Sequence, residues 1–244
     1  FIKNYNENEL GEICSSLGYP KFHGTQIFKW IFQKSCHSMA DMTNIPLSLK
    51  NDLKKEYQFS SLAIENQQKS KVDKTVKFLL KTHDNQFIES VSMIEADRHT
   101  VCLSSQIGCN VDCDFCATGK MGLTRNLSIS EIIEQFLIIS QNINNKITNI
   151  VFMGMGEPFL NYSNVIKACY IFSNPKAFNL STKRITISTA GILSKIESYI
   201  SEKHKFKLAI SLNASNNKFR ESIMPINKKW PIENLIAAIQ KYNF

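Results

Sequence analysis

The sequence has no run of apolar residues that approaches the ~18 residues of a membrane span, and nothing near its start has the pattern of a signal peptide. It also has no internal repeat and no low-complexity segment. These absences exclude membrane-spanning, fibrous and repeat proteins. Arginine is scarce as well: the chain contains only Arg98, Arg125, Arg184 and Arg220. Each arginine either remains by chance in a composition that favours lysine or lies at a site that needs a planar, bidentate donor.

The composition is that of a folded protein with an anionic partner. At roughly 150 residues per domain, 244 residues allow one large domain, or one with a small accessory piece. Basic residues number 29 against 21 acidic ones, and the net charge of +8 favours nucleic acid as the partner. Seven cysteines are an odd number in a chain too large to need disulfide staples, so we expect a reducing, intracellular setting.

The front of the chain is predicted to be a helical module followed by a hairpin. Apolar residues recur at helical spacing through the first sixty residues or so, and Pro46 opens the third helix. The period then changes to two over residues 76–80, and residues 83–85 form a plausible turn. We therefore expect a helical accessory domain over residues 1–62 and a β-hairpin linker over residues 63–97.

The return strand of this hairpin carries a candidate proton acceptor. Phe87, Glu89, Val91 and Met93 point to the same side, which puts a carboxylate on an otherwise apolar face. Burial there would raise the pKa of Glu89 and poise it for proton transfer. From spacing alone, the simpler interpretation is an edge strand whose glutamate reaches water.

Residues 98–244 are predicted to form an α/β core. Strands alternate with helices, which indicates a parallel sheet with right-handed crossovers. Periodicity alone does not choose between a doubly wound sheet and part of a barrel. The expected strands are 99–105, 148–153, 184–188 and 206–212, and the expected helices lie near 128–142, 162–173, 191–202 and 232–242.

Four cysteines lie within fifteen residues: Cys102, Cys109, Cys113 and Cys116. The last three form C-x-x-x-C-x-x-C in the loop after the first core strand, where close thiols can bind one metal centre. Three thiolates on an iron–sulfur cubane would leave one iron open for a ligand. A structural zinc ion needs four ligands, and Cys102 is poorly placed inside a strand to be the fourth. The zinc interpretation, a non-catalytic RNA-binding module, remains the rival from a different functional class.

The cysteine triad resembles that of the radical S-adenosylmethionine (SAM) superfamily. Five further stretches resemble the RlmN/Cfr family of RNA methyltransferases: residues 103–109, 154–158, 187–191, 208–214 and 224–229. The resemblance implies a partial (β/α)6 TIM-like radical SAM barrel, incomplete here, behind an RNA-binding accessory domain. It implies methylation of C2 of an adenosine in 23S rRNA, and of an adenosine in the tRNA anticodon loop. A C8 methyltransferase of the Cfr type is the alternative. A radical SAM enzyme for a small molecule is disfavoured by the basic charge and the helical front.

The resemblance also implies a set of site residues. Cys109, Cys113 and Cys116 would ligate one [4Fe–4S] cluster, and SAM would bind the open iron through its amino and carboxylate groups. The residues that would contact SAM are Gly156, Glu157, Ser188, Ser211, Leu212 and Asn213, the last of which departs from the histidine that the family often has. Glu89 matches the proton acceptor of the family. Cys102 matches a cysteine that forms a disulfide late in the reaction.

One family residue has no counterpart in the sequence. The family methylates a cysteine near its C-terminus, whereas no cysteine follows Cys169, which lies in a helical, apolar stretch. We therefore expect a chain truncated before its last strands, and no methylated RNA from residues 1–244 alone. Further expectations are a monomer in the cytoplasm and an electron donor such as flavodoxin or ferredoxin. A last hypothesis is that some of the four arginines grip RNA phosphate or the SAM carboxylate.

Overall fold

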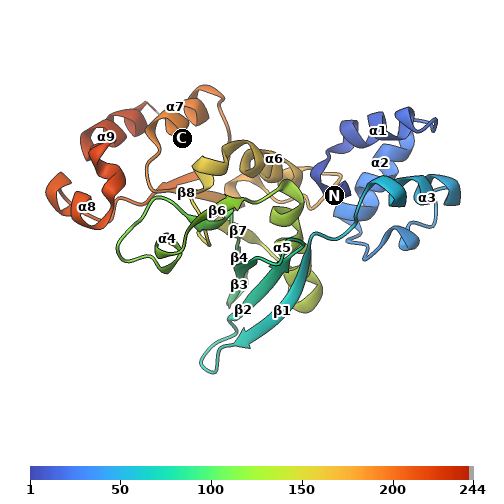
Figure 1. The fold of residues 1–244 in the computed structure, drawn as a ribbon, viewed down its shortest axis with the longest axis horizontal. Coiled ribbons are helices and arrows are strands. Elements are labelled where there is room, and N and C mark those ends of the chain that lie inside the picture. The colour runs from blue at the N-terminus through green and yellow to red at the C-terminus, as the bar shows by residue number, and fades with distance from the viewer. Residues whose placement is uncertain (242–244) are drawn as a thin grey trace.

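The computed structural model describes residues 1–241, which form a large mixed sheet, a small two-stranded sheet and the helices that pack around them (Figure 1). Seven strands run in the order β1-β2-β3-β4-β7-β8-β9, and β5 and β6 form a separate two-stranded sheet. The helices of the front module lie at one end of the molecule, and α8 and α9 lie at the other (Figure 1). None of the helices in the described part of the chain is both long and apolar enough to cross a membrane.

The front module contains the predicted helices. They are α1 (Glu7–Ser16), α2 (Phe22–Phe28) and α3 (Leu47–Glu56), with a π-helical turn over Lys29–Gln33 and 3-10 turns over Ile2–Asn4 and Met39–Asp41. Asn6 begins α1 with a capping box, since its side chain accepts from the Glu9 N–H and the Glu9 carboxylate accepts from the Asn6 N–H. α1 and α2 cross at Gly11 and Gly24, where a Cβ on Gly24 would lie 2.2 Å from the Gly11 nitrogen. Only glycine allows this approach.

Four antiparallel strands follow the front module, and three of them were predicted: the two strands of the hairpin and the first core strand. β1 (Leu62–Lys69), β2 (Val76–Thr82), β3 (Phe87–Glu95) and β4 (Arg98–Cys102) pair in sequence order. The turn at residues 83–85 is present, with Asn85 in the left-handed region at φ 60°. β1 was not predicted because neither of its faces is buried over most of its length, so its residues do not alternate. The hairpin is thus part of the same sheet as the core strands.

The parallel part of the sheet matches the predicted alternation. β4, β7 (Asn149–Phe152), β8 (Ile185–Thr189) and β9 (Lys207–Ile210) pair in parallel. The helices that follow β4, β7 and β8 are α5 (Ile129–Asn142), α6 (Tyr162–Ser173) and α7 (Leu193–Ser201). The first core strand is shorter than the predicted 99–105 because the chain leaves the sheet after Cys102.

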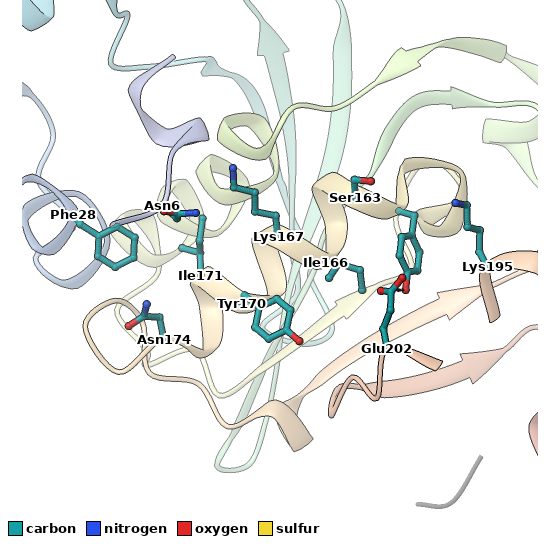
Figure 2. A pocket seen from close by; sticks show the side chains of 11 residues that line it. Asn6, Phe28, Ser163, Ile166, Lys167, Tyr170, Ile171, Asn174, Lys195 and Glu202 are labelled. Carbon is teal, nitrogen blue, oxygen red and sulfur yellow. Dashed lines mark hydrogen bonds between the residues drawn. The ribbon is translucent and has the colours of Figure 1, made fainter. Parts of the chain in front are cut away.

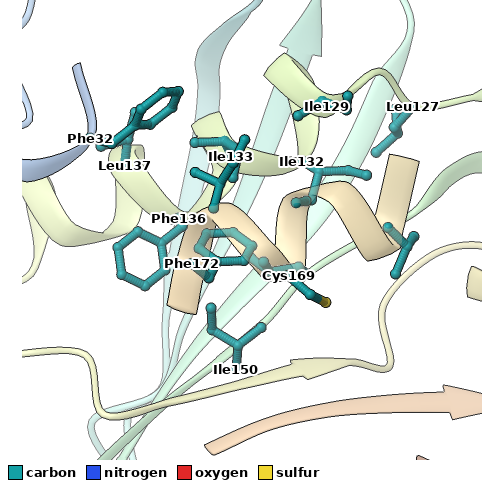
Figure 3. Close-up of a cluster of buried hydrophobic side chains, with 14 of the residues drawn as sticks. Phe32, Leu127, Ile129, Ile132, Ile133, Phe136, Leu137, Ile150, Cys169 and Phe172 are labelled. Atoms are coloured by element: carbon teal, nitrogen blue, oxygen red, sulfur yellow. The ribbon is translucent and has the colours of Figure 1, made fainter. Parts of the chain in front are cut away.

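The core is continuous between the front module and the sheet (Figure 3). Phe32 of the front module lies 6.0 Å, ring centre to ring centre, from Phe178, which lies 4.6 Å from Phe136 of α5. Phe136 in turn lies 5.2 Å from Phe172 of α6. Cys169 is fully buried in this core, as its helical stretch predicted. The front module therefore shares its apolar interior with the α/β core.

Several short elements were not predicted, and they build the rim of the sheet. β5 (Gln106–Cys109), α4 (Ala117–Lys120) and β6 (Gly122–Asn126) carry the cysteine loop. A 3-10 turn over Pro158–Asn161 follows β7, and a 3-10 turn over Thr182–Arg184 precedes β8. α8 (Asn217–Ile223) and a 3-10 turn over Pro225–Lys228 follow β9 and were not predicted either. They lead to α9 (Ile232–Gln240), which matches the helix predicted near 232–242.

Candidate active site at the carboxyl ends of the parallel strands

A cavity of about 360 Å³ opens at the carboxyl ends of β7, β8 and β9, and we call it the cysteine pocket. In parallel α/β folds this is the edge at which ligands gather. Its lining residues are Cys109, Val111, Cys113, Phe115, Cys116, Phe152, Met153, Gly154, Gly156, Glu157, Pro158, Ser188, Thr189, Ala190, Ser211, Asn213 and Met224. The pocket thus gathers all three cysteines of the triad and five of the six residues predicted to contact SAM.

The hairpin of β5 and β6 presents the cysteines. Gly108 lies at φ 73°, and a Cβ there would lie 1.7 Å from the carbonyl oxygen of Gly122 on the facing strand. Only glycine can occupy this position, which turns Cys109 toward the pocket. The Cys116 N–H donates to the Cys113 carbonyl at 3.0 Å, and the Asp114 N–H donates to the Ile223 carbonyl at 2.8 Å. These bonds hold the loop against α8.

The three thiols fit a cluster that supplies positive charge. Burial raises the pKa of Cys109, and it raises the pKa of Cys113 to about 11, with the neighbouring thiolates opposing ionisation further. A bound metal centre would reverse this, because it stabilises thiolates. A single tetrahedral zinc ion would bring its sulfur ligands to about 3.8 Å of one another. Among the residues that the structure describes, the three cysteine sulfurs do not all lie within 4.8 Å of one another. Their spacing is therefore wider than a single zinc ion requires.

Glu157 is a buried carboxylate at the floor of the pocket. Its Oε1 accepts from the Phe159 N–H at 2.9 Å and its Oε2 from the Ala190 N–H at 2.7 Å. Burial raises the pKa of Glu157, and the two N–H donors oppose that rise. A cation that enters the pocket would therefore meet a carboxylate without competing water.

The backbone before Glu157 is fixed by β5. Gly156 lies at φ 95°, and a Cβ there would lie 2.5 Å from the Cβ of Gln106. The Glu157 N–H donates to Gln106 Oε1 at 2.7 Å, and Gln106 Nε2 donates to Asn126 on β6. Gln106 was not among the predicted site residues, because it lies inside a recognised stretch but has no chemical signal of its own.

The ends of β8 and β9 supply the opposite wall. The hydroxyl oxygens of Ser188 and Ser211 lie 3.2 Å apart. Asn213 has φ 57°, and its Nδ2 lies 3.4 Å from the sulfur of Met224. Leu212 does not line the pocket, and its carbonyl accepts from Arg220 Nε at 3.0 Å. Of the predicted SAM contacts, Leu212 alone is placed outside the pocket lining.

Glu89 and Cys102 lie outside the pocket, on one half-exposed face of the sheet. Cys102 pairs with Val91, two residues from Glu89, so both side chains point to the same face. Glu89 is not buried on an apolar face but reaches water, as the simpler interpretation predicted: its side chain is 44% exposed and pairs with Lys77 at 2.8 Å. The strand is not an edge strand, however, since β2 and β4 flank it. The Glu89 N–H lies 3.3 Å from the sulfur of Met155, which places this strand beside the Gly156 turn.

Two of the four arginines are occupied by the protein itself. Arg125 makes bidentate hydrogen bonds of 2.8 to 3.0 Å with Asp84 and Glu131. Arg220 is fully buried and binds backbone carbonyls. For both, the hypothesis that they grip RNA phosphate or SAM is wrong, because their donors are already used. Arg98 and Arg184 are exposed.

A larger cleft of about 620 Å³ runs along α6, between the front module and α7 (Figure 2). Asn6 and Phe28 lie at one end of it, and Lys195 and Glu202 lie at the other (Figure 2). Its main charges are paired: Lys167 with Glu9 at 2.6 Å, and Glu202 with His204 at 2.6 Å. None of the residues predicted for the active site lines this cleft.

Comparison with known proteins agrees with the geometry of the pocket. Residues 103–244 match the radical SAM superfamily, and residues 2–58 match the ribosomal RNA large subunit methyltransferase N-terminal domain. A probable dual-specificity RNA methyltransferase RlmN from Chlorobium phaeobacteroides is 41% identical, with 99% of this chain and 69% of that protein covered. The chain belongs to the RlmN family of radical SAM RNA methyltransferases.

Further RlmN-family relatives give the same result. One from Thermotoga maritima is 41% identical, with 96% of this chain and 68% of that protein covered. The crystal structure of a radical SAM methyltransferase from Sphaerobacter thermophilus superposes with a TM-score of 0.93 at 38% identity, over 98% of this chain and 71% of that one. This chain is therefore an SAM-dependent RNA methyltransferase of the radical SAM superfamily, which uses a [4Fe–4S] cluster and SAM. The zinc-module and small-molecule interpretations are both wrong.

Proposed function

We propose that this RlmN-family protein methylates C2 of an adenosine in 23S rRNA and of an adenosine in the tRNA anticodon loop. The observation that carries the proposal is the cysteine pocket, which gathers the triad, the buried Glu157 and the two strand-end serines. The relatives are named dual-specificity RNA methyltransferases, which supports two RNA substrates. The net charge of +8 suits contacts with phosphate in both.

The pocket residues divide between the cluster and SAM. Cys109, Cys113 and Cys116 would hold the [4Fe–4S] cluster, which, when bound, supplies the electron that cleaves SAM. Glu157 would receive the SAM amino group, because a desolvated carboxylate pairs strongly with an ammonium. The other proposed SAM contacts are Gly156, Ser188, Ser211, Leu212 and Asn213, with Leu212 acting through its backbone because it does not line the pocket.

Glu89 and Cys102 would act on the RNA side of the reaction. They share the half-exposed face of the sheet, which a nucleotide can reach. Glu89 would accept the proton from the adenine ring, and its ion pair with Lys77 fixes the carboxylate on that face. Burial raises the pKa of Cys102, which keeps it a thiol before the late step. In that step its sulfur would attack the sulfur of the family's methyl-carrying cysteine, which this sequence lacks. The S–S bond would form as the bond from that sulfur to the carbon attached to the adenine breaks, and the electron pair would leave with that carbon.

The architecture that we propose has three parts. Residues 1–62 would be an RNA-binding accessory domain, residues 63–97 a hairpin linker, and residues 98–244 a radical SAM core of the partial (β/α)6 type. The helices that end at Glu56 and the strands that begin at Leu62 support the first boundary. We further propose a monomer that receives electrons from a flavodoxin or ferredoxin.

The position of the new methyl group tests the function. Residues 1–244, and a chimera in which they replace the matching region of the Thermotoga maritima relative, would be reconstituted anaerobically with iron and sulfide. Each would be incubated with deuterated-methyl SAM and either a 23S rRNA fragment or tRNA, and the RNA digested for mass spectrometry. Labelled 2-methyladenosine from the chimera with both RNAs is the expected result. Labelled 8-methyladenosine would show the Cfr-type reaction instead, and a product from one RNA only would remove the dual specificity.

A further inference from the structure

Arg220 is the largest of the fully buried side chains, and it lies beside the cysteine pocket. It belongs to α8, whose following residue Met224 lines the pocket. Large charged side chains are rarely buried completely unless an opposite charge accompanies them. The position of this guanidinium therefore calls for an explanation.

The guanidinium joins the loops that follow two neighbouring strands. Its Nη2 donates to the Ala190 carbonyl, after β8, at 2.6 Å and lies 3.4 Å from the Ser211 carbonyl, after β9. Its Nε donates to the Leu212 carbonyl at 3.0 Å, and its Nη1 donates to the Asn227 side-chain oxygen at 2.9 Å. The planar fork of arginine can make these bonds together, whereas a single ammonium cannot.

The same contacts lead to Glu157. Ala190, whose carbonyl accepts from Arg220, donates its own N–H to Glu157 Oε2 at 2.7 Å. Ser211, on the second loop, places its hydroxyl 3.2 Å from that of Ser188. One buried side chain thus fixes the backbone beside Glu157, Ser188 and Ser211, three of the proposed SAM contacts.

Among residues 1–241, no carboxylate makes a hydrogen bond or an ion pair with Arg220. In the part of the chain that the structure describes, every hydrogen bond of its guanidinium ends on a neutral oxygen. Burial lowers the pKa of Arg220, and the nearby Cys113 thiolate opposes this. In the proposed site, three thiolates would outweigh the positive charge of an oxidised [4Fe–4S] core, so a cluster held by the triad would be a net anion, and reduction would add a further negative charge. Such an anion would balance the charge of Arg220.

We propose that Arg220 is a positioning residue with two separable actions: its planar fork holds the strand-end loops that receive SAM, and its buried charge balances the anionic cluster. The proposal rests on the site residues of the proposed function. The first action predicts an effect on SAM affinity, and the second predicts an effect on the reduction potential of the cluster. A residue that only stabilised the fold would change neither in protein that remains folded.

The test compares Arg220→Gln and Arg220→Lys with Lys218→Gln, which removes an exposed charge from the same helix. Each protein would be reconstituted anaerobically, and its iron content and thermal unfolding measured. The midpoint potential would be measured by an EPR-monitored redox titration without SAM, and the SAM dissociation constant by equilibrium dialysis. No RNA is present, so the result does not depend on which adenosine carbon is methylated.

We expect Arg220→Gln to shift the reduction equilibrium at least tenfold toward the oxidised cluster, which is about 59 mV for one electron. Its SAM affinity should fall at least tenfold. Arg220→Lys should keep the potential within a threefold change of the equilibrium but lose SAM affinity as Arg220→Gln does, and Lys218→Gln should match the wild type. If Arg220→Gln does not fold, Arg220→Lys decides alone.

Three results would overturn the proposal. The first is a folded Arg220→Gln whose reduction potential and SAM affinity are both unchanged. The second is an Arg220→Lys that matches the wild type in both measurements, and the third is an Arg220→Lys whose reduction equilibrium is shifted tenfold or more. Wild-type protein that bound neither iron nor SAM would overturn the proposed function itself, which keeps the two failures distinct.

Discussion

Glu157 is the residue on which the binding of the SAM amino group depends in the proposed site. We expect Glu157→Gln to weaken SAM binding about tenfold or more, because a hydrogen bond to a charged group contributes about 1.5–3 kcal/mol. Isothermal titration of the reconstituted protein with SAM measures this. Glu202→Gln, which alters an exposed carboxylate, is the control. An unchanged dissociation constant in folded Glu157→Gln would remove Glu157 from the site.

At the scale of residues, the sequence predicted which cysteines lie together better than it predicted long-range contacts. The triad of Cys109, Cys113 and Cys116 was recognised from its spacing, and all three line the cysteine pocket because residues of one short loop are close in space. The partners of Arg220 could not be found this way, since its acceptors are backbone carbonyls, which have no signature in a sequence. Glu89 was assigned to an apolar face because the register of its strand against β2, which brings Lys77 onto the same face, was not predicted.

The turn between β2 and β3 is attached to α5 by one ion-pair network. Arg125 holds Asp84 in that turn and Glu131 in the first turn of α5. The guanidinium lowers the pKa of Asp84 well below its ordinary 3.8. When the pKa of a carboxyl group is lower in the folded than in the unfolded protein, the ionised group stabilises the fold at pH values above the unfolded pKa. This stabilisation is lost as the pH falls toward the pKa of the folded protein.

We therefore expect Asp84→Asn to be less stable than the wild type at pH 7, with a deficit that shrinks as the pH falls below about 4. The loss should be modest because the Asp84 side chain is 38% exposed. Urea unfolding at pH 7 and pH 3 measures both values. If Asp84→Asn were destabilised equally at both pH values, the lost ion pair with Arg125 would not be the cause of the destabilisation.

The start of α5 depends on a capping box. The Ser128 hydroxyl accepts from the Glu131 N–H at 3.3 Å, and the Ser128 N–H donates to the Glu131 carboxylate at 2.8 Å. We expect Ser128→Ala to lower the free energy of unfolding by about 1 kcal/mol. Ser15→Ala, at an exposed position of α1, should lower it less or not at all. Chemical denaturation of both variants decides whether the cap contributes.

At the scale of elements, periodicity located those that bury one face. α5, α6 and the parallel strands were predicted to within a few residues because their apolar residues recur at the helix or strand period. β5 and β6 were missed, because four or five residues with Gly108 and Gly122 among them give no period. Short elements that are held by close backbone approach leave little trace in a sequence.

The front module is attached to the core by a buried ion pair between Lys3 and Glu134 of α5. Glu134 also accepts from the Ser61 N–H and hydroxyl and from the Leu62 N–H, at 2.6 to 2.7 Å. Removing one partner of a buried pair costs about 3–5 kcal/mol. We expect Lys3→Met to lower the free energy of unfolding by about 3–5 kcal/mol. The double variant Lys3→Met with Glu134→Gln should recover part of this loss.

Calorimetry tests this pair and the shared core together. We expect one unfolding transition in the wild type, which Lys3→Met shifts as a whole to lower temperature. Two transitions, of which only the first moved, would show that the front module unfolds on its own.

The charge of the whole molecule gives a prediction for RNA binding. Each phosphate that a lysine or arginine neutralises releases counterions, so affinity falls as salt rises. With a net charge of +8, we expect the affinity for an rRNA fragment to fall at least tenfold between about 50 and 200 mM KCl. Fluorescence anisotropy with labelled RNA measures the slope. A flat salt dependence would mean that the basic residues do not contact the backbone of the RNA.

The Lys3–Glu134 contact also bears on how such a chain can diverge. Lys3, Ser61 and Glu134 are far apart in the sequence, but their side chains meet in the protein interior. A substitution at one of them therefore changes which side chains the other two positions can accept. The front module therefore cannot be exchanged as an independent cassette between family members. We expect chimeras that join the front of one relative to the core of another to express well only where these three positions are inherited together.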